Sequence, residues 1–546
     1  MERGFPSRYW ALAGAVVVFV LTVPRWNAGN GWRFLAIASA LLVLVGIYDL
    51  AQRRSAVLRN YPVLAHIRFM FQAIRPMLRQ YVVESDTEEV PFSHVQRDIV
   101  YKRSLDALDD NPFGTEINVY SEQYEWINHS IAPTLIDSHD FRVPVGGAAC
   151  TQPYSASVFN ISAMSFGSLS PNAIRALNEG ARRGGFYHDT GEGSLSSYHR
   201  ENGGDVVWEL GSGYFGACEH AGVFSPDRFV ERATLEQVKM IEIKLSQGAK
   251  PGHGGILPAA KVNREIAETR GVPIGEDCIS PSRHSTFSTP EGLLQFVARL
   301  RELSGGKPVG FKLAMGHPWE WFGIAKAMQE TGILPDFIVV DGGEGGTGAA
   351  PLEFSDHVGA PLREALMLVH NTLVGLNLRS QIRIGASGKV ITAFDIARTL
   401  ALGADWCNAA RGFMFALGCI QSRSCHTDHC PTGITTQNPE RWKSLNVLDK
   451  AERVRYFHEN TLKALKELIC ASGLSHPSEL GPEHVIQRVS SVEVRSLAAL
   501  FQFVRPGALL DSVPDHAVFQ RFWPQARTDS FAPPRDVAEL RWTKVN

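Results

Sequence analysis

The stretch DFIVVDGGEGGTGAAP, residues 336–351, decides the fold, because a short β-rich apolar run ends there in a glycine-rich loop. The same order of strand, loop and helix recurs on both sides of it. It is seen in KPVGFKLAM (307–315) before PWEWFGIAKAMQETG (318–332), and in QIRIGASGKV (381–390) before TAFDIARTLALG (392–403). Alternation of strands and helices predicts a parallel α/β fold. The number of repeats suits a (β/α)8 TIM barrel, in which the chemistry lies in the loops after the strands.

The barrel is expected to extend in both directions from this stretch. Further strands are predicted in SVFNISAMSFG (157–167), MIEIKLSQG (240–248) and ADWCNAARGF (404–413), the last of these being the final strand. The predicted domains are a membrane hairpin at 1–52, a connecting and capping segment at 53–150, the barrel at 151–475 and a C-terminal tail at 476–546.

Two apolar runs without Lys or Arg stand near the N-terminus, YWALAGAVVVFVLTV (9–23) and FLAIASALLVLVGIYDL (34–50). With its flanking aromatic residues, each would cover roughly 25 to 30 Å as a helix, at about 1.5 Å per residue. A signal peptide explains the first run alone, whereas two runs in tandem favour a membrane hairpin. The alternative is a buried helical pair that packs on the barrel or on a partner.

More arginines flank the predicted hairpin than lie in its turn. The flanking residues are Arg3, Arg8, Arg53, Arg54 and Arg59, and those in the turn are Arg25 and Arg33. The positive-inside rule then places both ends of the hairpin in the cytoplasm. We therefore expect a protein of the cell membrane, with lipid as one partner and a cytoplasmic catalytic domain.

The overall composition excludes one class of partner. A hydrophobic content of 44% with 20% charged residues is ordinary for a globular protein. The formal net charge of -2 provides no electrostatic footprint for nucleic acid. We therefore expect no nucleic-acid partner.

Three cysteines fall close together in GCIQSRSCHTDHCPTG, residues 418–433. The spacing C-x5-C-x4-C lets three thiolates converge on one inorganic cluster, and three ligands suit a three-iron cluster better than a four-iron one. A zinc site is the main alternative, although structural zinc usually shows shorter gaps within each ligand pair. Unligated thiols are a third possibility. The residues concerned are Cys419, Cys425 and Cys430, with His426 or His429 as the fourth zinc ligand.

The other cysteines are scattered along the chain and show no disulfide pattern, which fits a reducing cytosol. They are interpreted as small buried residues. They are Cys150, Cys218, Cys278, Cys407 and Cys470.

The loops after the last two predicted strands favour a phosphate ligand. Barrels often bind phosphate there, through backbone N–H groups and a nearby helix start. Neither loop is a dinucleotide fingerprint or a Walker loop, and glycine turns without a ligand are the alternative. The candidate residues are Gly385, Ser387, Gly388 and Lys389 in the first loop, and Arg411 and Gly412 in the second.

Residues 157–470 resemble the flavin-binding synthase domain of glutamate synthase. The motifs that carry the resemblance are long and occur in order: SAMSFGSLS (162–170), TGEGSLS (190–196), IKLSQGAKPGHGG (243–255), GFKLAM (310–315), DGGEGGTGAAP (341–351) and CIQSRSCHTDHCPTG (419–433). The whole chain is most similar to stand-alone, membrane-anchored bacterial proteins of this family.

The resemblance implies a barrel that binds FMN and a 3Fe-4S cluster on the three cysteines. It also implies reduction of 2-iminoglutarate, made from 2-oxoglutarate and ammonia, to L-glutamate. Ala163, Met164 and Ser165 would end the first strand and line the isoalloxazine. Lys312 would place positive charge near the flavin N1–C2 carbonyl, although a lone strand-end lysine is otherwise usually solvated. The motif at 341–351 adds Gly346 and Thr347 to the expected FMN site.

Three further residues are expected to act on the substrate. Gln247 and Lys250 lie in a Gly/Pro-rich loop, where the lysine could pair with a substrate carboxylate as a compact point charge. Glu192 resembles a loop acid that could transfer a proton to the imine nitrogen. Taken without the resemblance, Glu192 between two glycines is more typical of a turn.

The chain departs from the family pattern on the substrate side and in its modules. His253 stands where the family usually has Glu, and SPSRHSTFS (280–288) replaces a stretch rich in Pro and paired His. The amidotransferase module has an N-terminal cysteine nucleophile, whereas Met1 is followed here by Glu2. Ammonia is therefore expected to be free or delivered by a partner amidotransferase. Without a dinucleotide fingerprint, electrons would come from a ferredoxin, a separate reductase or a membrane donor.

Two functional classes follow from these patterns. The first is an enzyme, a glutamate synthase-like oxidoreductase acting on CH-NH2 donors, and the joint presence of Gln247, Lys250 and Glu192 favours it. The second is a membrane-tethered electron-transfer or redox-sensing subunit, and His253 with the altered 280–288 stretch favours that. A flavoenzyme for another keto acid or an amine lies between them, because motifs predict fold better than function.

Overall fold

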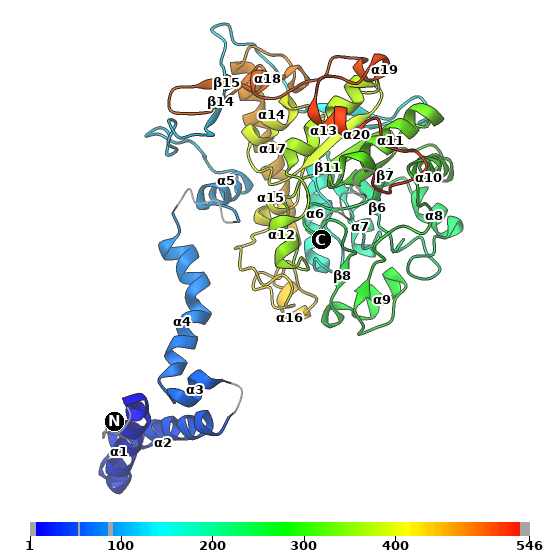
Figure 1. Ribbon diagram of the computed structural model, residues 1–546. Helices are drawn as coiled ribbons and strands as arrows, with labels where there is room; N and C mark the ends of the chain where they lie inside the picture. The colour runs from blue at the N-terminus through cyan, green and yellow to red at the C-terminus, as the bar shows by residue number, and fades with distance from the viewer. Residues whose placement is uncertain (1–6, 53–54, 86–90, 535–546) are drawn as a thin grey trace, which may run out of the picture. The chain divides into compact units, whose positions relative to one another are not determined.

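The computed structural model describes residues 7–52, 55–85 and 91–534, and the chain divides into two compact units, Met1–Val90 and Pro91–Asn546 (Figure 1). Three arginines of the charge argument, Arg3, Arg53 and Arg54, lie outside the described residues. The end of the predicted tail, 535–546, lies outside them as well.

The first unit begins with two apolar helices, α1 (Trp10–Thr22) and α2 (Asn30–Ala51), joined through a 3-10 helix at Val23–Ala28. They pack closely, because a Cβ added at Gly46 of α2 would clash with the Leu12 side chain of α1. By length and composition, Trp10–Ala28 and Asn30–Ala51 are both able to cross a membrane.

Two short helices complete the first unit, α3 (Ala56–Asn60) and α4 (Ala65–Leu78), followed by a π-helical turn at Arg79–Val83. Asp49 near the end of α2 is fully buried. Its carboxylate accepts the Val63 N–H (2.9 Å) and pairs with His66 Nε2 (2.9 Å). This carboxylate therefore holds the start of α4 against the end of α2.

The second unit is built on a closed barrel of eight parallel strands, which confirms the predicted TIM barrel. In order around the barrel, the strands are β4 (Phe159–Ile161), β5 (His188–Asp189), β6 (Val206–Leu210), β7 (Val238–Lys244), β10 (Val309–Leu313), β11 (Phe337–Asp341), β12 (Arg383–Ser387) and β13 (Trp406–Ala409).

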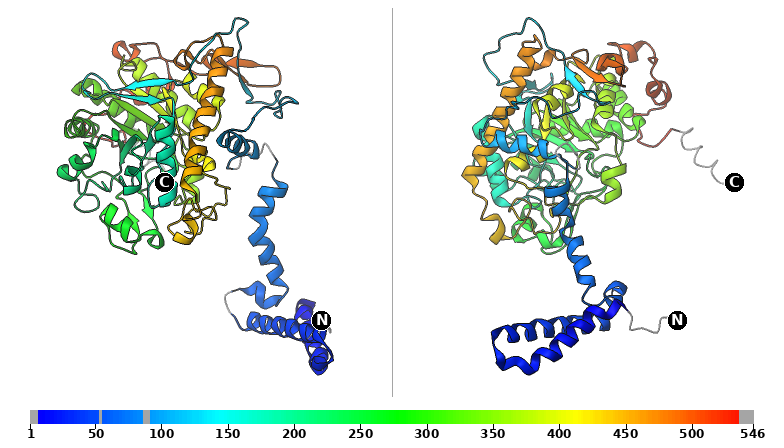
Figure 2. Two further views of the ribbon diagram at one scale, coloured as in Figure 1. Left: turned by 180° about the vertical axis from the view of Figure 1, so that it is seen from behind. Right: turned by 90° about the vertical axis from the view of Figure 1, so that its left-hand side faces the viewer.

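Helices follow the strands and surround the barrel (Figure 2). Those between successive strands are α6 (Pro171–Gly184), α7 (Ser197–Arg200), α8 (Pro226–Ala233), α9 (Arg264–Arg270), α10 (Pro290–Leu303), α11 (Pro318–Thr331), α12 (Leu352–His357), α13 (Leu362–Gly375) and α14 (Ala393–Ala401). After β13 come α15 (Arg411–Ala416), α16 (Pro439–Trp442) and α17 (Val447–Ala471). The long α17 packs along α6 and closes the ring.

Segments before and after the barrel pair with each other. Strand β1 (Glu125–Ile127) is antiparallel to β14 (Val485–Arg488), which pairs in turn with β15 (Val494–Ser496). Glu125 also binds Arg363 of α13 (2.7 Å) and Arg398 of α14 (2.9 Å), and this ties the small sheet to the barrel helices. The other elements are α5 (His94–Ser104), the hairpin β2 (Arg142–Val145) and β3 (Tyr154–Ser157), the hairpin β8 (Ile256–Leu257) and β9 (Cys278–Ile279), α18 (Leu497–Leu500), α19 (Ala508–Asp511) and α20 (Ala517–Phe522).

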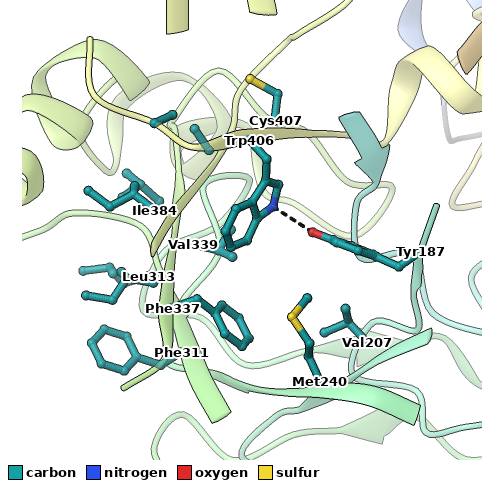
Figure 3. Close-up of a cluster of buried hydrophobic side chains, with 14 of the residues drawn as sticks. Tyr187, Val207, Met240, Phe311, Leu313, Phe337, Val339, Ile384, Trp406 and Cys407 are labelled. Atoms are coloured by element: carbon teal, nitrogen blue, oxygen red, sulfur yellow. Dashed lines mark hydrogen bonds between the residues drawn. The ribbon is translucent and has the colours of Figure 1, made fainter. Parts of the chain in front are cut away.

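One end of the barrel interior is filled by aromatic and aliphatic side chains (Figure 3). The buried Trp406 Nε1 donates to the Tyr187 hydroxyl (2.8 Å), which donates to Asn408 Oδ1 (2.7 Å). Gly385 of β12 makes room for this indole, because a Cβ at that position would lie 2.6 Å from the Trp406 ring. The indole and the phenol thus fill the barrel while their polar atoms satisfy each other.

Tyr187→Phe is predicted to destabilise the barrel, because it leaves the Trp406 N–H and the Asn408 carbonyl without their shared partner. A buried polar group that loses its partner costs roughly 1–3 kcal/mol in the free energy of unfolding. Urea unfolding followed by circular dichroism measures the loss. Tyr120→Phe, at a residue that is 76% exposed, is the matched control, and an equal effect of both substitutions would contradict this account.

Candidate active site

A layer of charged side chains lies inside the barrel toward the carboxyl ends of the strands. Asp189 ends β5, Glu209 lies in β6, Glu242 in β7 and Lys312 in β10, and all four are buried. Lys312 Nζ lies 2.7 Å from Glu209 Oε2 and 4.0 Å from Glu242 Oε1. One oxygen from each of the three carboxyl groups lies within 4.8 Å of the others. Such a group can hold a cation, and the Lys312 ammonium is the cation that this chain supplies.

The buried carboxyl groups do not share one ionisation state. Burial, with the neighbouring Glu209, raises the pKa of Asp189 to about 8. Burial, reinforced by Asp189, raises the pKa of Glu242 well above its ordinary value. Burial would lower the pKa of Lys312, but Glu209 and Asp341 outweigh it and the pKa lies well above the usual range. At neutral pH the layer therefore contains a Glu209–Lys312 ion pair beside carboxyl groups that retain protons.

Glu192 lies in the loop after β5, above this charged layer. Its Oε1 is 2.9 Å from Lys244 Nζ at the end of β7, and the same ammonium is 4.0 Å from Glu209 Oε1. Burial would raise the pKa of Glu192, but Lys244 outweighs burial and the pKa lies below its ordinary value. Glu192 is therefore ionised and forms an ion pair with Lys244.

Glycines shape the space around the Glu192 carboxylate. A Cβ at Gly211 would lie 2.8 Å from Glu192 Oε2, and one at Gly255 would clash with Oε1. Gly191 has φ +62°, and a Cβ there would lie 2.7 Å from the Ser165 nitrogen. The glycines of the TGEGSLS motif thus let the loops after β4 and β5 approach each other closely.

The loop after β7 carries Gln247 and Lys250, as the sequence predicts. Gly248 N–H donates to Asp341 Oδ2 (2.8 Å), which holds this loop against the end of β11. Lys250 is 2% exposed, and its ammonium donates to Gly254 O (2.7 Å). Burial lowers the pKa of Lys250, partly offset by Glu192. A buried ammonium beside an ionised glutamate is a suitable partner for a second carboxylate.

The two departures from the family pattern lie near these residues. His253 Nδ1 is 3.0 Å from Gly254 O, the carbonyl that also accepts from Lys250. In the altered 280–288 stretch, the buried His284 donates through Nε2 to Lys244 O (2.9 Å) and accepts from the Tyr214 hydroxyl (2.9 Å). Burial lowers the pKa of His284, so this histidine is a neutral support for the backbone of Lys244.

The first predicted flavin loop begins earlier than expected. Strand β4 ends at Ile161, so Ala163, Met164 and Ser165 lie in the following loop and do not end the strand. The pairing of β4 with β5 is confined to Ile161 and His188, and the pairing of β4 with β13 also ends at Ile161. Ser165 Oγ lies 3.4 Å from its donor Arg270 Nη2 and donates to Ser168 Oγ (3.1 Å).

The predicted phosphate residues divide between strand and loop. Gly385 and Ser387 belong to β12, because they pair with Trp406 and Asn408 of β13. Ser387 Oγ donates to Asp341 Oδ1 at the top of the neighbouring strand. Gly388 and Lys389 follow in the loop, with Lys389 at φ +50°.

Arg411 connects three of the predicted loops. It begins α15, next to Gly412, and its Nη2 donates to Gly346 O (3.0 Å) in the loop that also contains Thr347. Its Nη1 lies 4.0 Å from Cys425 Sγ. The loops after β11 and β13 and the cysteine loop therefore meet at one guanidinium. Lys389 and Arg411 provide cations beside glycine-rich backbone, so these loops fit the phosphate group of FMN.

The cysteine loop is suited to hold a cofactor through several cysteine thiolates. All eight cysteines of the chain are free. Burial raises the pKa of Cys419 to about 11, Arg411 opposes it, and Cys425 and Cys430 add to it through their charges, so the three thiols lie within electrostatic reach of one another.

Two cations lie beside these sulfurs and can balance thiolate charge. Lys261 is buried and donates to Cys425 O (2.8 Å) and Thr435 O (3.0 Å), and Arg411 lies near the Cys425 sulfur. In a tetrahedral zinc site, Zn–S bonds of about 2.3 Å would bring the sulfurs about 3.8 Å apart. Among the described residues, no such tight group includes these cysteines with His426 or His429.

Sequence reasoning missed four residues of the charged layer and its link to Glu192. They are Asp189, Glu209, Glu242 and Lys244. The signal was present in VVWELGSG (206–213) and MIEIKL (240–245), where charged residues interrupt strands that are otherwise apolar. A charge inside a buried strand has to be paired, so its presence predicts a neighbouring partner.

A family model described as the conserved region in glutamate synthase matches residues 118–475. The glutamate synthase large subunit-like protein YerD of Bacillus subtilis is 36% identical over 512 residues, which cover 86% of this chain and 97% of that protein. The archaeal glutamate synthase (NADPH) of Methanocaldococcus jannaschii is 37% identical over 316 residues, 58% of this chain and 59% of that protein.

Among solved structures, a flavocytochrome b2 variant with sulfite bound is similar with a TM-score of 0.41 and 14% identity. The match covers 82% of this chain and 92% of that one.

Asp189→Asn is predicted to change how stability depends on pH. Asparagine can still accept the Gly191 N–H (2.9 Å) but cannot ionise. Because folding raises the pKa of Asp189 from 3.8 to about 8, the native state of the wild type binds an extra proton between these values. The wild type therefore loses stability relative to the variant as pH rises from 4 to 8. Thermal unfolding across this range measures the difference. A constant difference would contradict the buried, protonated carboxyl, and Asp227→Asn on the exposed first turn of α8 is the control.

Proposed function

The chain belongs to the glutamate synthase family, and we propose that it is an FMN- and iron–sulfur-dependent oxidoreductase that reduces 2-iminoglutarate to L-glutamate. The imine forms from 2-oxoglutarate and ammonia. The observation that carries this proposal is the meeting of the flavin-type loops and the cysteine loop at Arg411, through Gly346 O (3.0 Å) and Cys425 Sγ (4.0 Å). A redox enzyme needs its two electron carriers close together, and this contact supplies that proximity.

The FMN site is proposed at the carboxyl ends of the strands. When bound there, FMN supplies hydride transfer and the cluster on Cys419, Cys425 and Cys430 supplies one-electron exchange. Lys312 provides the positive charge that the reduced ring requires, held in place by Glu209 (2.7 Å). The other proposed FMN contacts are Ala163, Met164, Ser165, Gly346, Thr347, Gly385, Ser387, Gly388, Lys389, Arg411 and Gly412.

The substrate is proposed to bind between the loops after β5 and β7. Lys250 attracts a carboxylate of the keto acid, exchanging its bond to Gly254 O for a charged partner. Gln247 in the same loop supplies neutral hydrogen bonds. Glu192 and Lys244 form an ion pair at 2.9 Å, and this pair is proposed to supply the proton for the imine nitrogen. The protonated carboxyl groups of the charged layer can then restore that proton through Glu209, 4.0 Å from Lys244.

The source of electrons is proposed to be a separate protein. The Methanocaldococcus jannaschii relative is named as an NADPH enzyme, but this chain spans 59% of its length. We therefore propose a ferredoxin, a reductase or a membrane donor, with ammonia either free or supplied by a partner amidotransferase. Attachment through the α1–α2 hairpin, with the barrel in the cytoplasm, would bring the enzyme to such a donor.

The assay that tests the reaction is a single oxidative turnover. Detergent-solubilised protein is purified anaerobically, reduced with dithionite and freed of excess reductant, and flavin reoxidation is followed on adding 2-oxoglutarate and ammonium. Reoxidation with a matching amount of L-glutamate is expected. A flavin that stays reduced, in protein with full FMN and cluster content, would reject the synthase reaction.

A second candidate is a related flavoenzyme for another keto acid or an amine. It is favoured by His253 beside the Lys250 loop and by His284, which supports Lys244 from the altered stretch. Replacing 2-oxoglutarate with other keto acids in the same assay distinguishes the two candidates by which compound reoxidises the flavin. If none does, an electron-transfer subunit is favoured.

Lys250→Ala is predicted to weaken keto-acid binding and leave the flavin spectrum unchanged. Loss of a charge-assisted hydrogen bond of about 1.5–3 kcal/mol corresponds to a KM for 2-oxoglutarate that rises roughly 10- to 150-fold. Steady-state kinetics with an artificial electron donor measure it. Lys239→Ala in β7 is the control, because that lysine pairs with Asp205 (3.6 Å) away from these loops. An unchanged KM would refute the assignment of Lys250.

Cys425→Ser is predicted to abolish the cluster while some FMN remains bound, since a hydroxyl is a poor ligand for this type of cluster. Iron and acid-labile sulfide analysis, with electron paramagnetic resonance of the oxidised protein, measures the loss. Cys470→Ser, in α17, is the matched control. Full iron content in Cys425→Ser would refute Cys425 as a cluster ligand. A complete loss of FMN would refute the assignment of cluster and FMN to separate sites.

A further inference from the structure

Helix α4, Ala65–Leu78, presents two chemically distinct faces along its length. Apolar residues recur at intervals of three and four, and arginine with glutamine recurs at the same intervals on the opposite side. The apolar set is Ile67, Met70, Phe71, Ile74, Met77 and Leu78, and the polar set is Arg68, Gln72 and Arg75, continued by Arg79 in the turn that follows.

The apolar face of α4 is not covered by the other described residues of the first unit. Met70 is 53% exposed, Phe71 55% and Met77 61%. Large side chains in a continuous exposed stripe mark a surface that binds something apolar. At 14 residues the helix is about 21 Å long, which is too short for a bilayer core of about 30 Å. With arginines along one side as well, the helix is suited to lie on a membrane and not to cross it.

The charged residues from the end of α2 to the end of the π-helical turn after α4 have a single sign, and four acidic residues follow that turn: Glu84, Asp86, Glu88 and Glu89. Between Asp49 and Glu84 the sequence contains six arginines and no acidic residue. They are Arg53, Arg54, Arg59, Arg68, Arg75 and Arg79. A cluster of basic residues next to a membrane segment is attracted to anionic phospholipid headgroups.

The start of α4 is fixed to the apolar hairpin. The buried Asp49 of α2 binds the Val63 N–H (2.9 Å), just before α4, and the His66 ring (2.9 Å), in the first turn of α4. A bilayer that covers the exposed sides of α1 and α2 would therefore have its surface close to the beginning of α4. Because α4 follows the apolar hairpin directly, lipid is favoured over the groove of another protein as the partner that covers its apolar face.

We propose that α4 is an interfacial helix that lies on the surface of an anionic bilayer, with Met70, Phe71 and Met77 among the acyl chains and Arg68, Arg75 and Arg79 at the headgroups. This inference goes beyond the proposed reaction and does not depend on it. In this role α4 selects the composition of the membrane to which the enzyme is attached, in addition to the anchorage that the hairpin provides.

Hydrogen–deuterium exchange of the full chain tests the proposal. The protein is reconstituted in nanodiscs of phosphatidylcholine alone or with phosphatidylglycerol, and exchange of the amides at 65–83 is compared. Exchange is expected to be slower in the anionic discs. Arg68→Gln with Arg75→Gln should reduce the stabilisation of α4 by anionic lipid roughly 25-fold, since each arginine near such a surface contributes about fivefold.

Two control variants separate charge from apolar contact. Arg68→Lys with Arg75→Lys keeps both charges and should keep the preference for anionic lipid. Met70→Gln with Phe71→Gln should remove protection in both kinds of disc. Exchange in the barrel peptides reports whether each variant is folded, and the same comparison with vesicles works whether or not the hairpin inserts.

Two results would overturn the proposal. The first is equal exchange of 65–83 in neutral and anionic lipid. The second is protection in detergent that increases with protein concentration, because a second copy of this chain would then cover the apolar face. The assay does not use FMN or substrate, so its failure is distinguishable from failure of the proposed reaction.

Discussion

The ion pair between Lys312 and Glu209, buried inside the barrel with Nζ and Oε2 2.7 Å apart, is the interaction on which the mouth of the barrel depends. Removal of one partner from a buried pair commonly costs about 3–5 kcal/mol, because an unpaired charge remains. Glu242 and Asp189 stand beside this pair with too little positive charge to ionise fully. The barrel therefore has an apolar end, filled around Trp406 and Tyr187 (Figure 3), and a polar end that retains protons next to the loops.

From this layer a series of contacts leads outward to the loops. Lys244 lies between Glu209 and Glu192, and Asp341 holds both the Gly248 N–H and the Ser387 hydroxyl. On the other side, Arg411 joins the loop of Gly346 to the cysteine loop. The residues proposed for substrate, FMN and cluster are thus connected through polar contacts, and the proposed reaction requires all three groups in one place.

The fold could be predicted from the sequence, whereas the charge states of the acidic side chains in the barrel could not. Strands such as β10 to β12 are visible because each is a mainly apolar run before a glycine-containing loop, whereas β5 has two residues and gives little pattern. Gly385 looked like a loop residue, and only the approach of Trp406 explains why a strand needs glycine there. The role of Glu192 as a proton donor stays a prediction, and its pairing with Lys244 could not be read from either motif because the two residues are far apart in the chain. The site assignments taken from the resemblance stay predictions.

The polar end of the barrel is thus expected to retain protons beside the loops proposed to bind the substrate. Infrared spectroscopy of the protein at neutral pH measures it most directly, because a protonated carboxyl group absorbs separately from a carboxylate. The account predicts a protonated-carboxyl band that persists at pH 7 and is diminished in both Glu242→Gln and Asp189→Asn. A spectrum without that band, or a band that neither substitution changes, would contradict it.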